Sequence, residues 1–334
     1  MVGMSGGVDS SVAAALLIEQ GYEVAGVTLQ LWEESDADAK RVAKALGIPH
    51  YTYDLRDEFR RSVVDYFISE YQNGRTPNPC IACNKHIKFG AMLDFAFEKG
   101  YDGVATGHYA RIVWENGRYR LMESENREKD QSYVLYHLTQ QQLAHILFPV
   151  DSLSKEQVRR IAQEKQLPVA FKSESQDICF IKNQSYTDFI ERYTGKSFPA
   201  GNFIDRDGTV LGRHKGIIYY TVGQRKGLGG TFGRPMYVTA INPEDNTITL
   251  GETGEEYADS LIAGNLRFTD GEMPSCFSVD VMVRYRSRRY SGQVSLLGNA
   301  MAKVIFDEPP RAVTKGQAAV FYDGGYVLGG GTIC

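Results

Sequence analysis

The stretch "GMSGGVDSS" at positions 3–11 holds three glycines and three serines but no lysine. Apolar residues at 1–4 predict a short buried strand before it, and apolar residues at helical spacing within 12–20 predict a helix after it. Such a turn collects backbone N–H groups at the positive end of a helix dipole. We therefore predict an anion-binding loop that differs from the P-loop, whose lysine contacts the β- and γ-phosphates. The alternative is a glycine-rich turn without a ligand.

The segments that follow alternate between strand and helix patterns. We predict strands over 23–32 and 101–108, with a helix over 36–46 between them. This alternation is typical of an α/β fold with a parallel sheet, in which ligands bind at the carboxyl ends of the strands. Leu29 and Gly107 fall near two such ends, where they would frame an adenine ring. The alternatives are a core leucine and an ordinary turn glycine.

Length and composition limit the class of protein. A chain of 334 residues exceeds the usual size of a single core, so two or three domains are expected. With 43% hydrophobic residues and no apolar run long enough to span a bilayer, the composition is that of a soluble protein. The pattern of a signal peptide is absent from the sequence, so a cytoplasmic location without a membrane partner is expected. The net charge of −4 still permits a local basic face for nucleic acid.

The pattern changes beyond residue 195. Short alternating runs separated by glycine, asparagine and aspartate turns predict two small β modules. We therefore predict three domains, with a first α/β domain over 1–195, a central β module over 196–252 and a second β module over 253–334.

Two basic clusters lie in these β modules. "RYRSRRY" at 284–290 contains four arginines, and it overlaps an alternating strand pattern over 277–286. "VGQRKGLGG" at 222–230 carries two more basic residues on a glycine-rich turn. A guanidinium group suits phosphate because its planar fork donates two hydrogen bonds. The alternative for either cluster is a solvated strand face, but the two together favour RNA binding. The predicted contacts are Arg225, Lys226, Arg284, Tyr285 and Arg286.

Five cysteines in a long chain without an export signal indicate free thiols, a metal site or redox chemistry. Cys80 and Cys83 form a C-x-x-C pair in a proline-rich context, and Cys179 follows much later in the chain. Zinc normally needs a second close pair, although His86 or His108 with Cys179 would complete a site. The redox interpretation needs one thiolate that attacks and a second that carries or resolves sulfur.

The order of the motifs resembles one known family. The loop is similar to the pyrophosphate-binding loop, S-G-G-x-D-S, of adenylating ATP pyrophosphatases. Together with it, "GRTPNPCIACNKHIKF", "ATGHYAR", "KDQSYVLYHL", "SESQDICFI" and "TVGQRKGLG" occur in the order found in tRNA-specific 2-thiouridylases. The resemblance covers nearly the whole chain. It implies a PP-loop domain, a linking β module and a C-terminal β-barrel that binds tRNA.

The resemblance also implies an activity and its residues. Members of the family adenylate O2 of the wobble uridine of tRNA with ATP and Mg²⁺, and replace that oxygen with sulfur from a cysteine persulfide. A persulfide donor protein and an external reductant are then needed as partners, while no tightly bound metal is expected. The implied nucleophile is Cys83 and the persulfide carrier is Cys179. ATP residues are Gly3, Met4, Ser5, Gly6, Gly7, Val8, Asp9, Ser10, Leu29 and Gly107. Residues for the target base are Asn78, Pro79 and Cys80, and those for tRNA are His108, Lys129, Asp130 and Gln131.

One position departs from the commonest family pattern. Cys80 stands where the family often has an aspartate, so the group that moves the uridine proton is unassigned in this chain. Two other functions remain open from the sequence. An adenylating synthetase or amidotransferase for a small metabolite would keep the loop without needing distant paired cysteines. A non-catalytic RNA-binding protein would keep the arginines without an active Cys83.

Overall fold

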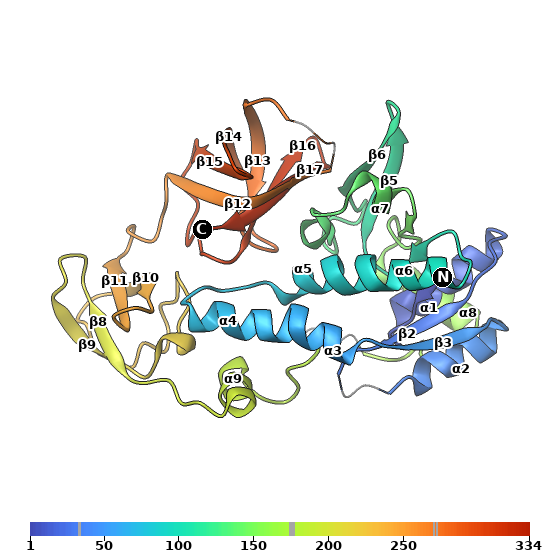
Figure 1. The fold of residues 1–334 in the computed structure, drawn as a ribbon, viewed down its shortest axis with the longest axis horizontal. Helices are drawn as coiled ribbons and strands as arrows, with labels where there is room; N and C mark the ends of the chain where they lie inside the picture. The colour runs from blue at the N-terminus through green and yellow to red at the C-terminus, as the bar shows by residue number, and fades with distance from the viewer. Residues whose placement is uncertain (33–34, 174–177, 270, 272) are drawn as a thin grey trace.

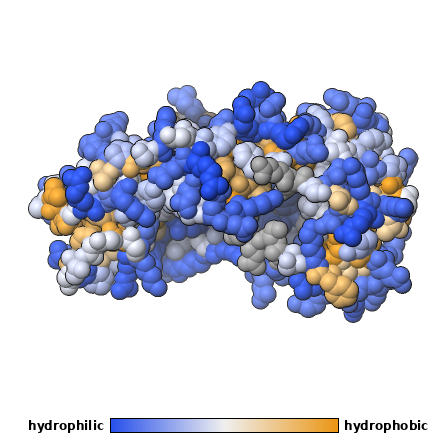
Figure 2. All heavy atoms as spheres, turned by 90° about the horizontal axis from the view of Figure 1, so that it is seen from below, coloured by the Kyte–Doolittle hydropathy of each residue, from blue (hydrophilic) through white to orange (hydrophobic). Residues whose placement is uncertain are grey.

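The computed structural model describes residues 1–32, 35–173, 178–269, 271 and 273–334. Three parts follow one another along the chain (Figure 1): an α/β part, a small β-sheet part, and a β-barrel that lies above the helices of the first. None of the described helices is both long and apolar enough to cross a membrane. The face seen in Figure 2 is predominantly hydrophilic, with small hydrophobic patches.

The first part is built on a parallel sheet of order β3-β2-β1-β4-β7. Its strands are β1 (Val2–Gly3), β2 (Gly26–Gln30), β3 (His50–Asp54), β4 (Val104–Ala105) and β7 (Ile146–Leu147). The helices are α1 (Val8–Glu19), α2 (Ala37–Leu46), α3 (Arg56–Phe59), α4 (Tyr66–Gln72), α5 (Pro79–Cys83), α6 (Met92–Glu98), α7 (Gln140–Leu143), α8 (Lys155–Glu164) and α9 (Tyr186–Thr194). The prediction of an α/β fold with a parallel sheet is confirmed.

Each face of this sheet buries its own set of apolar side chains. Residues of α1, α2 and α8 pack with Val2 and Met4 on one face. On the other face, α6 packs with Val27 and Val104. Burial on both faces explains why the strands read as short apolar runs rather than as alternating ones.

The predicted strand over 101–108 is correct in type but too long. Only Val104 and Ala105 form β4. Tyr101 belongs to the turn that closes the preceding helix, because its N–H donates to the carbonyl of Ala96. Gly107 and His108 leave the sheet at its carboxyl edge and line a cavity. The strand therefore ends at Ala105, and the residues after it form part of the cavity wall.

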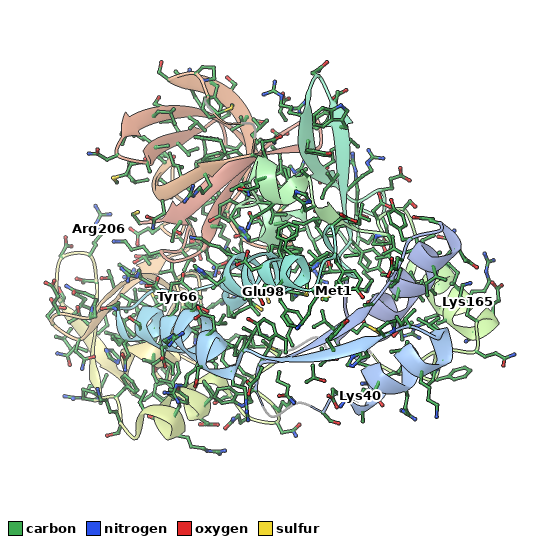
Figure 3. All side chains as sticks on the ribbon, turned by 45° about the vertical axis from the view of Figure 1, so that its right-hand side comes forward. Met1, Lys40, Tyr66, Glu98, Lys165 and Arg206 are labelled. Carbon is green, nitrogen blue, oxygen red and sulfur yellow. The ribbon has the colours of Figure 1, made fainter. Side chains whose placement is uncertain are left out.

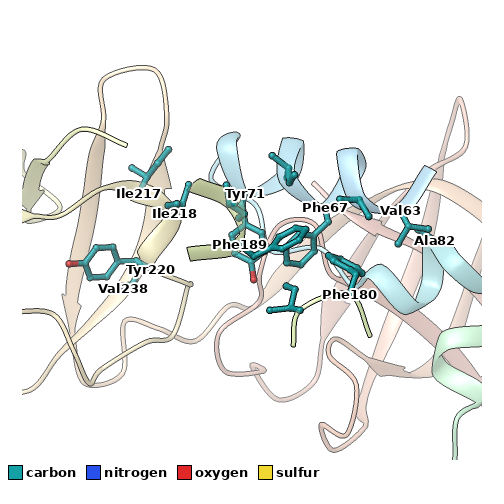
Figure 4. Packing of buried hydrophobic residues seen from close by; sticks show 14 of the residues in the cluster. Val63, Phe67, Tyr71, Ala82, Phe180, Phe189, Ile217, Ile218, Tyr220 and Val238 are labelled. Atoms are coloured by element: carbon teal, nitrogen blue, oxygen red, sulfur yellow. The ribbon is translucent and has the colours of Figure 1, made fainter. Parts of the chain in front are cut away.

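The second part has a sheet of order β10-β11-β8-β9. Its strands are β8 (Gly201–Ile204), β9 (Val210–His214), β10 (Met236–Asn242) and β11 (Thr247–Glu252). A large aromatic and aliphatic cluster joins this sheet to α4 and α9, as Figure 4 shows for Phe67, Phe189 and Val238.

The third part is a closed antiparallel barrel, since β12 pairs with both β15 and β17. Its strands are β12 (Ser260–Phe268), β13 (Cys276–Met282), β14 (Tyr290–Gly298), β15 (Met301–Phe306), β16 (Ala318–Asp323) and β17 (Tyr326–Ile333). A hairpin of the first part, β5 (Ala110–Glu115) and β6 (Arg118–Glu123), extends the barrel sheet where Tyr326 pairs with Met122. The first and third parts are thus joined edge to edge.

Candidate active site

The loop between β1 and α1 has the geometry of an anion site. Gly7 is the N-cap of α1, and Gly6 has φ +69°, a left-handed conformation that favours glycine. A side chain at Gly6 would place its Cβ 2.9 Å from Cβ of Asp38. Ser11 Oγ donates to the carbonyl of Gly7 at 2.8 Å. Because the first N–H groups of a helix have no partner within it, those that follow Gly7 face the loop and suit an anion.

Gly107 lies directly against this loop. A Cβ at Gly107 would stand 2.8 Å from both the carbonyl carbon of Asp9 and the amide nitrogen of Ser10. Both contacts are with backbone atoms, which cannot rotate away. Gly107 therefore allows the end of β4 to approach the first turn of α1, which is a more specific role than framing an adenine.

A cavity of about 900 Å³ opens at the carboxyl edge of the sheet. It unites residues that the sequence predicted separately for ATP, tRNA and sulfur. Predicted residues on its wall are Gly3, Met4, Ser5, Asp9, Ser10, Leu29, Gly107, His108, Gln131 and Cys179. Of the residues predicted for ATP, Gly6, Gly7 and Val8 are not among the described lining residues; they form the turn into α1.

Lysines reach this cavity from segments outside the loop. Lys88, Lys172 and Lys182 lie on its wall. Lys172 Nζ donates to the carbonyl of Gly6 at 3.0 Å and to Asp38 at 2.7 Å. Positive charge at the site thus comes from elsewhere in the chain. These lysines were not predicted from the sequence; the signal for Lys172 was its position seven residues before Cys179.

A further lysine contacts the loop itself. Ser154 and Gln157 form a capping box at the start of α8, as the sequence pattern predicts. Lys155, at the first helical position after this cap, also reaches the loop. Its Nζ lies 2.6 and 2.7 Å from the two carboxylate oxygens of Asp9. The hydroxyl of Tyr109 also donates to Asp9, at 2.9 Å.

His108 is buried on the cavity wall in a neutral state. Burial, and secondarily the charge of Lys88, holds the pKa of His108 well below its ordinary value. Lys88 Nζ lies 3.4 Å from Nε2 and can only donate, so Nε2 is the acceptor and Nδ1–H faces Thr106 Oγ1 at 2.7 Å. His108 can therefore accept a hydrogen bond but carries no charge for a phosphate.

The three residues of the "KDQ" stretch, Lys129, Asp130 and Gln131, are all partly buried but have different surroundings. Gln131 lines the cavity and accepts from the N–H of Tyr109 at 3.0 Å. Asp130 accepts from the N–H and the hydroxyl of Ser132, and burial raises its pKa. The carbonyl of Asp130 in turn accepts from the hydroxyl of Tyr285 at 3.4 Å. Lys129 lies in the turn before them. Two predicted tRNA segments, far apart in the sequence, are adjacent here.

The C-x-x-C pair lies in α5, and the residues just before the pair explain why the helix begins there. Asn78 is the N-cap of α5 and accepts from the N–H of Cys80 at 3.1 Å, while Pro79 occupies the first helical position. The side chain of Cys80 is exposed and that of Cys83 is buried. One helical turn therefore separates a solvent-facing thiol from a protected one.

Cys179 is exposed on the cavity wall. Its neighbour Phe180 is buried in the same cluster as Cys83 and Ala82, and Figure 4 shows Phe180 and Ala82 side by side in that packing. The cluster thus brings the two cysteine segments to one region. Residues 174–177 of the "SESQDICFI" motif lie outside the described part of the chain.

The barrel fixes the segment before the C-x-x-C pair. Gln317 Nε2 donates to the carbonyl of Thr76 at 2.7 Å, and the N–H of Thr76 donates to the carbonyl of Lys315 at 2.8 Å. The residues predicted for the target base are thus held by the predicted tRNA-binding domain. No sequence pattern marks Gln317 for this contact.

The arginine cluster is less uniform than the sequence predicts. The strand ends at Met282, so residues 284–286 lie in the turn after β13. Arg284 donates to Thr314 Oγ1 at 2.7 Å, while Arg286 is exposed above the ring of Tyr285. Arg288 and Arg289 are paired with Glu308 and Glu123. In the other cluster, Arg225 and Lys226 are exposed.

The described residues hold no group of three or more histidine, cysteine, aspartate or glutamate side chains placed to bind a metal ion. In particular, His86 is exposed on the helix that follows Cys83, whereas His108 is buried on the cavity wall.

Comparison with known proteins gives three family models that match successive parts of the chain. The family models described as "tRNA methyl transferase HUP domain", "tRNA methyl transferase PRC-barrel domain" and "Aminomethyltransferase beta-barrel domain" match residues 1–183, 187–252 and 258–333. Among solved structures, the NMN synthetase of Francisella tularensis is 20% identical over 59% of this chain and 77% of its own, with a TM-score of 0.34. The U34-tRNA thiolase NcsA of Methanococcus maripaludis is 18% identical over 58% and 63%, with a TM-score of 0.35.

Relatives of much higher identity extend over the whole chain. The tRNA-specific 2-thiouridylase MnmA of Carboxydothermus hydrogenoformans is 48% identical and covers 100% of this chain and 96% of its own length. That of Acetivibrio thermocellus is also 48% identical, with 100% and 98% covered. With this identity over its full length, the chain belongs to the tRNA-specific 2-thiouridylase family.

Proposed function

We propose that this chain is a tRNA sulfurtransferase that uses ATP to replace O2 of the wobble uridine with sulfur. The observation that carries the proposal is that Cys179 lies on the wall of the same cavity as the PP-loop. An adenylating enzyme for a small metabolite has no need for a thiol at that place. A non-catalytic RNA-binding protein has no need for the cavity.

The first chemical step is adenylation of the uridine. O2 of the uridine attacks the α-phosphorus of ATP, the bond to the β-phosphate bridge breaks, and pyrophosphate leaves into the loop. The backbone N–H groups at the start of α1 and the lysines on the wall stabilise the charge of that leaving group. Adenylation converts a poor leaving oxygen into AMP.

The second step transfers sulfur. The terminal sulfur of a Cys179 persulfide forms the new bond to C2, and AMP departs with the former O2. Cys83 attacks the inner sulfur of the persulfide, so a Cys83–Cys179 disulfide forms as the S–S bond to the terminal sulfur breaks. The two cysteines are thereby oxidised by two electrons. An external dithiol reductant supplies these electrons and returns both cysteines to thiols. A persulfide donor protein reloads Cys179.

Asp38 lies on the cavity wall, where its carboxylate would help to hold a Mg²⁺ ion that the phosphates of ATP bring with them. Asp9 is already held by Lys155 and Tyr109. The ion would neutralise phosphate charge there. We place the reaction in the cytoplasm, where tRNA is modified.

Loss of the protein should remove one modified nucleoside. We expect tRNA from cells without this chain to lack wobble 2-thiouridine when its digested nucleosides are measured by mass spectrometry. Re-expression of the chain should restore it. Normal 2-thiouridine in the deleted cells would refute the proposed function.

The products of ATP should identify the type of phosphate chemistry. Since the loop has no P-loop lysine, turnover with tRNA should release AMP and pyrophosphate in equal amounts. Chromatography of nucleotides after a single turnover measures this. Release of ADP and phosphate instead would contradict adenylation while leaving tRNA binding untouched.

The exposed arginine of the barrel turn should contact tRNA. We expect Arg286→Ala to weaken tRNA binding about threefold to tenfold and to reduce the dependence of affinity on salt by about one counterion. Arg288→Ala is the matched control, because Arg288 is also exposed but already pairs with Glu308. Filter binding across a salt series separates the two. If the salt dependence of tRNA affinity were unchanged in Arg286→Ala, Arg286 would face solvent and not tRNA.

A further inference from the structure

Helices α1 and α8 lie side by side and run in the same direction. Lys155 pairs with Asp9 near their amino ends, and Lys165 pairs with Glu19 near their carboxyl ends. Between these ion pairs, Val158 and Ala162 of α8 pack in the same buried cluster as residues of α1. The positive ends of both helix dipoles therefore meet beside the loop.

The carboxylate of Asp9 occupies this positive region. Lys155 contacts both of its oxygens, at 2.6 and 2.7 Å, and the hydroxyl of Tyr109 contacts Oδ1 at 2.9 Å. The side chain of Lys155 is only 12% exposed, and Tyr109 is buried. Two segments distant from the loop thus hold this carboxylate in place.

Asp9 faces the cavity, whereas Lys155 is absent from the described residues that line it. An unpaired carboxylate on that wall would repel the phosphates of ATP. We propose that Lys155 is a positioning residue, which neutralises and orients Asp9 from behind. In this way α8 supplies the positive charge that the loop sequence lacks. The inference rests on the proposed binding of ATP in this cavity.

The first test compares ligands with and without phosphates. We expect Lys155→Met to lower ATP affinity at least about tenfold, since a partly buried carboxylate loses its partner. Affinity for adenosine should change less than about twofold, because adenosine has no charge to be repelled. Calorimetric titration in the presence of EDTA measures both without a contribution from metal binding. Lys155→Arg should restore most of the ATP affinity.

A second lysine offers a matched control. Lys165 joins the same two helices through Glu19, and Figure 3 shows it at the outer edge of the molecule, away from Met1 at the start of β1. Lys165→Met should lower the melting temperature no more than Lys155→Met does, since Glu19 is the more exposed carboxylate, and it should leave ATP affinity unchanged. Equal losses of ATP and adenosine affinity in Lys155→Met would show a merely structural role and overturn the inference.

The double variant decides between positioning and direct contact. If Lys155 acts through Asp9, then Asp9→Asn combined with Lys155→Met should bind ATP within about threefold of Asp9→Asn alone, since no carboxylate is left to repel it. A double variant as weak as Lys155→Met would show that Lys155 acts on the phosphates themselves and would overturn the inference. Failure of the unmodified protein to bind ATP would instead refute the proposed function. ATP binding by Lys155→Met at the unmodified level would overturn only the role of Lys155.

Discussion

Cys83→Ser and Cys179→Ser are each expected to reduce thiolation of tRNA to background while AMP and pyrophosphate are still released. A serine hydroxyl at 179 cannot carry sulfane sulfur, and a serine at 83 cannot form the disulfide that expels it. Adenylation depends instead on the loop and on the lysines around the cavity. The measurement combines mass spectrometry of the tRNA product with nucleotide analysis in the same reaction.

Cys80→Ser is the control for these variants. Cys80 lies one helical turn before Cys83 but its side chain is exposed, so its replacement should leave substantial thiolation activity. Cys80→Asp, which introduces the side chain common in the family, should also remain active. Thiolation by Cys83→Ser at the normal rate, or a stoichiometric zinc ion released by either loop substitution, would overturn the sulfur-transfer mechanism.

Gly107→Ala is expected to have the other large effect, on ATP binding. The added methyl group would lie 2.8 Å from backbone atoms of Asp9 and Ser10, so the loop itself must move. Overpacking of this kind costs about 1–3 kcal/mol. If ATP binding must return the loop to its native position, that cost lowers ATP affinity by about fivefold to 150-fold. Nucleotide titration of the purified variant measures the loss.

Gly212→Ala provides the comparison for Gly107→Ala. Gly212 lies in β9 of the central sheet. A Cβ added there would have Cε1 of Phe232 as its nearest atom, at an ordinary contact distance of 3.8 Å. ATP affinity and the melting temperature of this variant should match those of the unmodified protein. If Gly107→Ala bound ATP equally well, the close approach of β4 to the loop would have no functional role.

Features that depend only on residues close together in the chain could be predicted from the sequence alone. Backbone conformation and capping are decided within a few residues, so the loop before α1 and the capping box at Ser154 were predictable. The same holds for the helix that begins after Asn78, with proline at its first position. The alternation of strand and helix patterns likewise predicted the parallel sheet.

Charge partners were decided only by the tertiary structure. Lys155 meets Asp9 across 146 residues because α8 packs parallel to α1, and no local pattern contains that packing. For the same reason Arg284 is engaged by Thr314 while Arg286 remains exposed, although the two look equivalent in the sequence. A long basic side chain has many possible partners within reach, and the fold selects among them by placing distant segments together. The sequence therefore determined the glycine-rich loop before α1, and the fold determined which lysines contact it.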